Sequence, residues 1–179
     1  MTDSENEPLL TAFPPIVRSD ARVLVLGSMP GVRSLAEQRY YAHPQNAFWP
    51  IMGRLAGAGP GRPYAERVER LKDAGVALWD VLAECRRPGS LDSRIRPGSV
   101  RANDFASLLE GLPAIRRIAF NGRAAETLFR RHVAPDLPRP AAAVPRVVLP
   151  STSPAYAAMP REAKLEAWRE ALGDLVGSA

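Results

Sequence analysis

The chain of 179 residues is 46% hydrophobic and carries a net charge of +5, so it is long enough for one hydrophobic core and short for two. Its one cysteine, Cys85, excludes a disulfide framework and the Cys-rich zinc and iron–sulfur sites, so we expect no metal. No apolar run reaches bilayer length and the first residues are acidic rather than signal-like, so we expect a cytoplasmic protein without a membrane partner.

The chain begins with polar and acidic residues, and we expect residues 1–12 to form a mobile tail ahead of a single domain over residues 13–179. The first predicted element of that domain is a buried parallel strand at Val23–Leu26, a run of β-branched and leucine residues. The run stops at Gly-Ser-Met-Pro-Gly, residues 27–31, a composition typical of a tight loop. Open α/β sheets bind their ligands at such strand ends.

Residues 40–49 combine flat aromatic rings with amide and imidazole edges. The segment reads Tyr-Tyr-Ala-His-Pro-Gln-Asn-Ala-Phe-Trp, a mixture that suits a planar heterocycle and that a core rarely needs. Asn46 is also a good N-cap for a helix that continues to about Leu55. A second amphipathic helix is predicted from Tyr64 to Ala74, before Gly75.

The second strand is predicted at Val-Ala-Leu-Trp-Asp-Val-Leu, residues 76–82, with Asp80 as an acid inside an apolar run. A basic loop is expected next, because two Pro-Gly-Ser triplets alternate with five arginines: Arg86, Arg87, Arg94, Arg96 and Arg101. Arginine binds phosphate as a fork, so this loop is a candidate for following a phosphate backbone. The arginine richness of the chain, 22 of 24 basic residues, has an equally good explanation in genome base bias.

The remaining predicted elements alternate between helix and strand. They are a helix over 103–110, a strand over 115–120 that ends in Asn121-Gly122, a helix over 124–132, an extended Pro-rich segment over 135–145, a strand over 146–149, a loop over 150–156 and a helix over 161–175. This alternation predicts an α/β fold, a three-layer α/β/α sandwich with a central four-stranded parallel sheet. Four loops then meet at the carboxyl edge of the sheet.

Four motifs lie in or near those loops: Gly-Ser-Met-Pro-Gly, His-Pro-Gln-Asn-Ala-Phe-Trp, Leu-Trp-Asp-Val-Leu with Gly-Ser-Leu-Asp-Ser, and Pro-Ser-Thr-Ser-Pro-Ala. Over residues 13–175 the chain thereby resembles the uracil-DNA glycosylase superfamily, most of all its hypoxanthine-DNA glycosylase branch, with the mismatch-specific uracil glycosylases next. The resemblance implies a repair enzyme that flips a deaminated nucleotide out of DNA and hydrolyses its N-glycosidic bond, leaving an abasic site. It implies a DNA partner and no cofactor, and we expect a monomer.

The resemblance implies Asn46 as the main catalytic residue and His43 as a second. In many relatives an Asn or Asp at the position of Met29 positions the attacking water, which a thioether cannot do; the hypoxanthine branch resembles this chain in lacking that residue and in relying on the amide at Asn46. An amide pairs with O6 and N1–H of hypoxanthine, and equally with the matching edge of uracil. The preference among hypoxanthine, uracil and xanthine therefore stays open.

The resemblance further implies that the Phe48 ring stacks on the flipped base and that Ser153 holds a DNA phosphate, with Tyr156 as the one local candidate for a wedge in the base stack. The base-binding set is Phe48, Tyr41, Met29, Gly27 and Ser28, and the DNA-binding set is Ser151, Thr152, Ser153, Tyr156, Arg94 and Arg96. Structural alternatives exist: Asn46 as a helix cap, Phe48 as core, and the serines as an ordinary turn.

Two other functional classes remain open. One is a hydrolase or transferase of free nucleotides, although the first loop lacks the Gly-Lys-Ser/Thr ending of a Walker A motif. The other is a module that binds damaged DNA without turnover, which would fit the thioether at Met29 and the basic loop.

Overall fold

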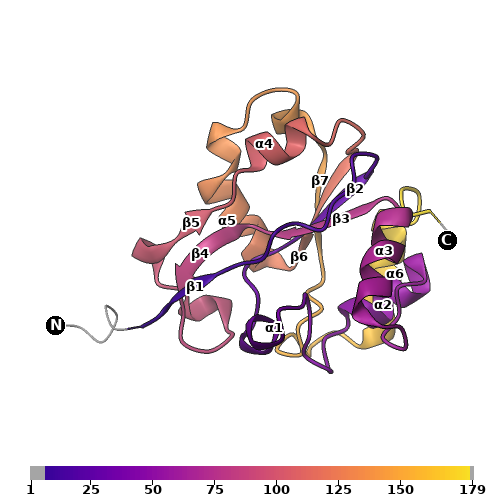
Figure 1. Ribbon diagram of the computed structural model, residues 1–179, viewed down its shortest axis with the longest axis horizontal. Coiled ribbons are helices and arrows are strands. Elements are labelled where there is room, and N and C mark those ends of the chain that lie inside the picture. Colours follow the sequence, from indigo (N-terminus) through magenta and orange to yellow (C-terminus); the bar gives the residue numbers. More distant parts are fainter. Residues whose placement is uncertain (1–6, 178–179) are drawn as a thin grey trace.

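A four-stranded parallel sheet forms the centre of the computed structural model, which describes residues 7–177 (Figure 1). The strand order is β3-β2-β6-β7, and every neighbouring pair is parallel. The strands are β2 (Val23–Gly27), β3 (Val76–Asp80), β6 (Arg117–Asn121) and β7 (Arg146–Leu149). All residues of β2 and β3 are buried, as expected for strands covered on both faces.

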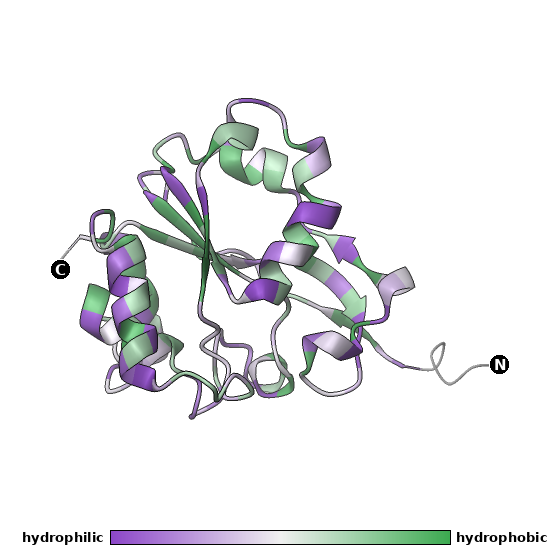
Figure 2. Cartoon of the chain, turned by 180° about the vertical axis from the view of Figure 1, so that it is seen from behind, coloured by the Kyte–Doolittle hydropathy of each residue, from purple (hydrophilic) through white to green (hydrophobic). Residues whose placement is uncertain are grey.

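Two layers of helices cover the sheet, and they lie on opposite sides of it in Figure 1. The helices are α1 (Val32–Glu37), α2 (Phe48–Ala56), α3 (Tyr64–Asp73), α4 (Phe105–Glu110), α5 (Arg123–His132) and α6 (Arg161–Leu172). Val23 and Val25 face a core that contains Trp168 of α6, whereas Leu24 and Leu26 face one that contains Phe129 of α5. The predicted three-layer α/β/α sandwich is therefore confirmed. Figure 2 shows the hydrophobic colour concentrated along the central strands.

A second, antiparallel sheet lies beside the first and was not expected from the sequence. Its order is β1-β4-β5, formed by β1 (Leu9–Thr11), β4 (Leu82–Arg86) and β5 (Arg101–Ala102). Residues 1–6 of the expected mobile tail lie outside the described residues, but Leu9–Thr11 pair with Glu84–Arg86. The second half of the expected tail is thus part of a sheet.

The apolar run over residues 76–82 was expected to be one strand, but it divides between two sheets. β3 ends at Asp80, and the backbone turns at Val81 into β4. Two hydrogen bonds hold this turn, because Val81 N donates to Gly27 O at 2.8 Å and Leu82 N donates to Ser28 O at 3.0 Å. The turn therefore lies against the loop that follows β2.

Helix boundaries differ from the expected ones where polar residues compete for the first turn. α2 begins at Phe48 with Ala47 as its N-cap rather than Asn46, and α4 begins at Phe105 behind Asp104, whose side chain accepts from Ser107 N.

Helix α1 was not expected. Short 3₁₀ turns occupy Asp92–Arg94, Pro97–Ser99, Ala134–Asp136 and Ala141–Ala143. Within residues 7–177, no helix is long and apolar enough to cross a bilayer.

Candidate functional site

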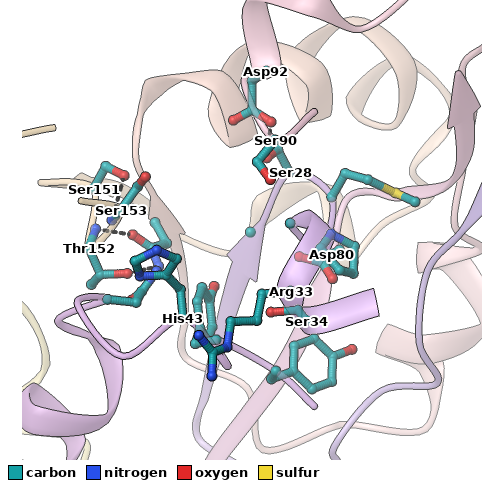
Figure 3. Close-up of a pocket in the computed structure, with 18 of the residues that line it drawn as sticks. Ser28, Arg33, Ser34, His43, Asp80, Ser90, Asp92, Ser151, Thr152 and Ser153 are labelled. Atoms are coloured by element: carbon teal, nitrogen blue, oxygen red, sulfur yellow. Dashed lines mark hydrogen bonds between the residues drawn. The ribbon is translucent and has the colours of Figure 1, made fainter. Parts of the chain in front are cut away.

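A pocket of about 170 Å³ opens at the carboxyl edge of the parallel sheet (Figure 3). All four predicted loops contribute to it, through residues 27–34 after β2, Asp80 at the end of β3, Asn121 at the end of β6, and residues 151–154 after β7. The segment 40–46 and the loop that contains Asp92 close its sides. Sites for drug-sized ligands measure about 300–1,000 Å³, so this pocket is on the scale of one small planar group.

Gly27, predicted as a base-binding residue, lies where three segments meet at the pocket. A Cβ atom added to Gly27 would lie 2.5 Å from Asp80 Oδ1 and 3.0 Å from the Tyr41 hydroxyl oxygen. Real Cβ atoms do not approach other atoms at 2.5 Å, so a side chain at this position would displace the carboxylate. The missing Cβ of Gly27 therefore lets Asp80 and Tyr41 approach the end of β2.

Asp80 is a buried carboxyl group with only 3% of its surface exposed, and its Oδ2 atom has no hydrogen-bond partner among the described residues. Burial, with a smaller contribution from the Asp92 charge, raises the pKa of Asp80 to about 7, against the opposing effect of Arg87. A carboxyl group with this pKa exchanges a proton at neutral pH, as acid–base catalysis requires.

Asp92 supplies a second carboxyl group, which sequence reasoning missed although the Gly-Ser-Leu-Asp-Ser motif contains it. Ser28 Oγ donates to Asp92 Oδ1 at 2.8 Å, and Figure 3 shows the two side chains together. Burial raises the pKa of Asp92, and the Ser28 hydrogen bond and the Arg87 charge oppose that rise. Two carboxyl groups of unequal environment therefore line one pocket.

Arg87 holds the first loop against the loop that contains Asp92. Its side chain is fully buried; Nη1 lies 3.7 Å from Asp92 Oδ1, and Nη2 donates to Pro30 O at 2.5 Å. This arginine was predicted as part of an exposed phosphate-binding loop. The structure instead gives it an internal role, because a buried guanidinium needs a carboxylate and carbonyl oxygens around it.

Asn46 lines the pocket with its amide orientation set by the backbone. Its Oδ1 accepts from Phe48 N at 2.9 Å, and only the oxygen can accept, so Nδ2 is left as the donor. His43 also lines the pocket, and its Nδ1 accepts from Gln45 N at 3.1 Å. A neutral His43 therefore carries its proton on Nε2. Both predicted catalytic residues thus present a donor group.

The expectation that Phe48 stacks on a base is wrong for this conformation of the chain. The Phe48 ring is 0% exposed and packs edge-on against Trp49 and Trp168 in the core. Its flat face is covered by Tyr41, with ring centroids 4.1 Å apart and planes at 25°. Tyr41, whose backbone is left-handed (φ 53°), lines the pocket, whereas Phe48 does not.

Met29 and Ser28 line the pocket as predicted for the base-binding set, although each also has a structural contact. Met29 is 6% exposed and packs in the core between the sheet and α5, and Ser28 is hydrogen-bonded to Asp92. The thioether of Met29 is only a weak acceptor and has no proton to exchange, so its side chain cannot act as an acid or a base.

The loop after β7 is held by a reciprocal pair of hydrogen bonds. Asn121 Nδ2 donates to Thr152 Oγ1 at 2.8 Å, and Thr152 N donates to Asn121 Oδ1 at 2.9 Å. Thr152 is 1% exposed and lines the pocket, and because its hydroxyl is held by Asn121, its contact with DNA stays a prediction. Ser151 and Ser153 line the pocket, and each hydroxyl accepts from the backbone N–H two residues later, which leaves its own proton to donate.

The other predicted DNA-binding residues are not brought to the pocket. Arg96 pairs with Glu7, with Nη2 to Oε1 at 2.6 Å, and Arg94 is exposed outside the lining. Tyr156 is 40% exposed beside a separate surface hollow, and Lys164 binds its carbonyl oxygen at 2.7 Å. The basic loop over residues 86–101 is therefore partly neutralised by acidic residues, unlike the exposed loop expected from the sequence.

The pocket can support hydrolytic acid–base chemistry. It offers donors at Asn46, His43 and the two serines, an exchangeable proton at Asp80 and a second carboxyl group at Asp92. Within residues 7–177, no three His, Cys, Asp or Glu side chains are grouped as metal ligands. Positioning, proton transfer and hydrogen bonding are the means that these side chains supply.

Comparison with known proteins gives three findings. The family model described as the uracil DNA glycosylase superfamily matches residues 14–176. Hypoxanthine DNA glycosylase of Methanosarcina acetivorans is 39% identical over 114 residues, which cover 63% of this chain and 71% of that protein. The protein of the same name from Methanosarcina barkeri is 35% identical over 112 residues, which cover 62% of this chain and 70% of that protein. The solution NMR structure of a candidate uracil DNA glycosylase from M. acetivorans has a TM-score of 0.75 and 31% identity, covering 94% of this chain and 99% of that one.

Proposed function

The chain belongs to the uracil DNA glycosylase superfamily, and on that premise we propose that it removes hypoxanthine from DNA by hydrolysis of the N-glycosidic bond. The observation that carries this proposal is the pocket that joins Asn46 and His43 to the buried carboxyl group of Asp80 and the half-buried one of Asp92 at the carboxyl edge of the sheet. Relatives named hypoxanthine DNA glycosylase at 35–39% identity support this base over others.

The pocket has the polarity that a flipped hypoxanthine requires. Hypoxanthine presents O6 as an acceptor, and the pocket holds the Asn46 Nδ2 donor, whose position is fixed because Oδ1 accepts from Phe48 N. Adenine presents an amino donor where hypoxanthine presents O6, so it would leave the Asn46 donor without an acceptor. The Tyr41 ring, rather than Phe48, supplies the surface on which the base stacks.

Hydrolysis in this pocket breaks the bond from C1′ to N9 and forms a bond from C1′ to a water oxygen. The base leaves with the electron pair of the broken bond, and donors at Asn46 and His43 stabilise the charge that develops on it. A carboxylate at Asp80 or Asp92 accepts a proton from the attacking water. Met29 takes no part in this proton transfer.

The direct test is a cleavage panel with duplexes that contain one inosine, uracil or xanthine, followed by alkaline scission of the abasic product. We expect the inosine duplex to be cut fastest. Faster cutting of the uracil duplex would show that uracil rather than hypoxanthine is the preferred base, since uracil presents the same donor and acceptor order. Tight binding of the inosine duplex without any product would reject catalysis.

We also propose that the enzyme acts as a monomer in the cytoplasm. The residues proposed for catalysis, Asn46, His43, Asp80 and Asp92, already meet in the pocket of a single chain. Cys85 is a buried thiol, which fits a reducing compartment. Sedimentation of the protein with and without DNA tests the monomer.

A further inference from the structure

A second hollow, of about 330 Å³, adjoins the pocket along residues 40–46. We call it the arginine groove, defined by Arg39, Arg67, Arg161, Trp49 and Tyr64. Three cationic side chains line this one groove: Arg39 after α1, Arg67 in α3 and Arg161 at the start of α6. None of the three arginines was expected from the sequence to bind a ligand.

Aromatic rings hold two of the cations in place. The guanidinium of Arg39 lies 5.6 Å from the centroid of the Tyr64 ring, and that of Arg67 lies 5.9 Å from the same centroid. Arg67 also lies 5.2 Å from the ring of Trp49. Planar guanidinium groups that rest on aromatic faces keep their N–H edges available for another partner.

The rings themselves are fixed by hydrogen bonds to the segment that separates the two hollows. Tyr40 N donates to the Tyr64 hydroxyl at 3.0 Å, and Trp49 Nε1 donates to Tyr40 O at 2.8 Å. Tyr40 itself is 4% exposed. The floor of the arginine groove is therefore rigid before any ligand binds.

The groove lacks the negative charge that its cations require. Within residues 7–177, no carboxylate lies within 4.0 Å of the guanidinium of Arg39, Arg67 or Arg161. The acid in the lining, Glu37, is already paired with Arg33 at 2.7 Å. Burial and the nearby charge of Arg39 lower the pKa of Arg67, which is the effect of a cation that has a like charge as its neighbour.

The groove continues directly from the pocket. Tyr40, Tyr41, His43 and Asn46 contribute to the walls of both hollows. A strand whose base occupies the pocket must leave past this segment, and the groove provides cations on that path. By contrast, Arg96 and Arg101 of the basic loop already pair with Glu7 and Glu84.

We propose that the arginine groove binds the phosphodiester backbone of the DNA strand next to the nucleotide held in the pocket. This proposal rests on the proposed function for the identity of the nucleic acid. The ligand chemistry is a row of phosphates, which guanidinium edges bind as forks, with no reading of the neighbouring bases.

The test compares two double variants that remove the same charge. Arg39→Gln with Arg161→Gln removes two exposed cations of the groove and leaves Arg67 on its rings. Arg116→Gln with Arg131→Gln is the matched control, because both arginines are exposed and line neither the pocket nor the groove. Binding to an undamaged duplex is measured by fluorescence anisotropy at several salt concentrations. Each lost phosphate contact makes the slope of log K against log salt shallower by about 0.9.

We expect the groove variant to bind DNA more weakly with a slope shallower by roughly 1–2 units, and the control to keep the parent slope. An unchanged slope in the groove variant, or an equal change in the control, would overturn the proposal. In single-turnover excision of inosine, half-saturation should require a higher concentration of the groove variant than of the parent. The plateau rate of the groove variant should equal that of the parent. Loss of the plateau rate would also overturn it, because the groove would then act in the chemistry.

A third arm separates the two sources of phosphate. Inosine monophosphate should compete with duplex DNA equally well for binding to the parent and for binding to the groove variant. The reason is that one free nucleotide does not reach along the groove. Stronger competition in the parent would show that the groove binds free nucleotides. If the parent excises no base but the slope changes as expected, the proposed function fails and the backbone contact stands.

Discussion

The pocket and the arginine groove share one wall, the segment 38–46, but the pocket is lined by acidic side chains and the groove by basic ones. The pocket holds two carboxyl groups, the buried Asp80 and the half-buried Asp92, and Asp92 has the Ser28 hydroxyl and the Arg87 guanidinium as partners. The groove holds cations on aromatic rings without carboxylate partners within residues 7–177. The difference indicates that one side of the segment supplies proton chemistry and the other supplies attraction for phosphate.

The largest expected effect comes from Asn46→Asp, a change that separates the two sides. Aspartate keeps an oxygen to accept from Phe48 N and loses only the Nδ2 donor in the pocket. Removal of one donor that stabilises developing charge lowers turnover by about 10²–10³-fold. Single-turnover excision of inosine should fall by this factor, while affinity for undamaged duplex changes little.

Gln45→Glu is the matched control, because Gln45 is exposed one residue earlier and the substitution adds the same charge. It should retain parental excision. Parental excision in Asn46→Asp would remove Asn46 from the chemistry, and an equal loss in Gln45→Glu would point to the added charge instead.

Asp80→Asn should change the pH dependence of the enzyme. The pKa of Asp80 is raised to about 7 in the folded protein and is ordinarily about 3.9, so the native state keeps a proton that the unfolded chain releases between these values. Folding stability of the parent therefore falls as pH rises from about 4 to 7, by at most about 4 kcal/mol. The Asn variant lacks this loss, and above pH 7 it should unfold at higher denaturant concentration than the parent.

The excision rate should follow the ionisation of the same Asp80 carboxyl group, because the ionised form is the one that accepts a proton. The parental rate should rise with pH through about 7, and the rise should be absent in Asp80→Asn. Asp136→Asn, an exposed position outside the pocket, removes the same charge and should preserve the rise. A parental rate that is flat between pH 5 and 9 would exclude Asp80 from proton transfer.

Thr152→Val should have the smallest effect and should act on stability rather than on DNA. It removes the Oγ1 acceptor of Asn121 and leaves a buried amide donor without its partner. The expected cost is about 1–3 kcal/mol. Thermal unfolding measures that cost, and DNA affinity should stay at the parental value. Ser153→Ala, at the next residue of the pocket wall, is the comparison that should weaken DNA binding.

The division of the molecule into strands and helices was predictable, because buried parallel strands are continuous apolar runs and the helices have a 3.6-residue period. The second sheet was not predictable in the same way. β4 continues the apolar run of β3 without a break in composition, and the turn at Val81 depends on hydrogen bonds to Gly27 and Ser28 from a distant segment. The local sequence around Val81 does not specify those hydrogen-bond partners.

The sequence by itself determined the order of elements and the edge of the sheet at which Asn46, His43 and the serine loop gather, since the direction of parallel strands decides where their loops lie. Only the tertiary structure decided that Tyr41 covers Phe48, that Asp92 joins Asp80, and that Arg39 and Arg67 lack carboxylate partners within residues 7–177 while Arg96 has one. The physical reason is that burial and charge pairing depend on contacts between residues far apart in the chain, which residue types and local spacing do not specify.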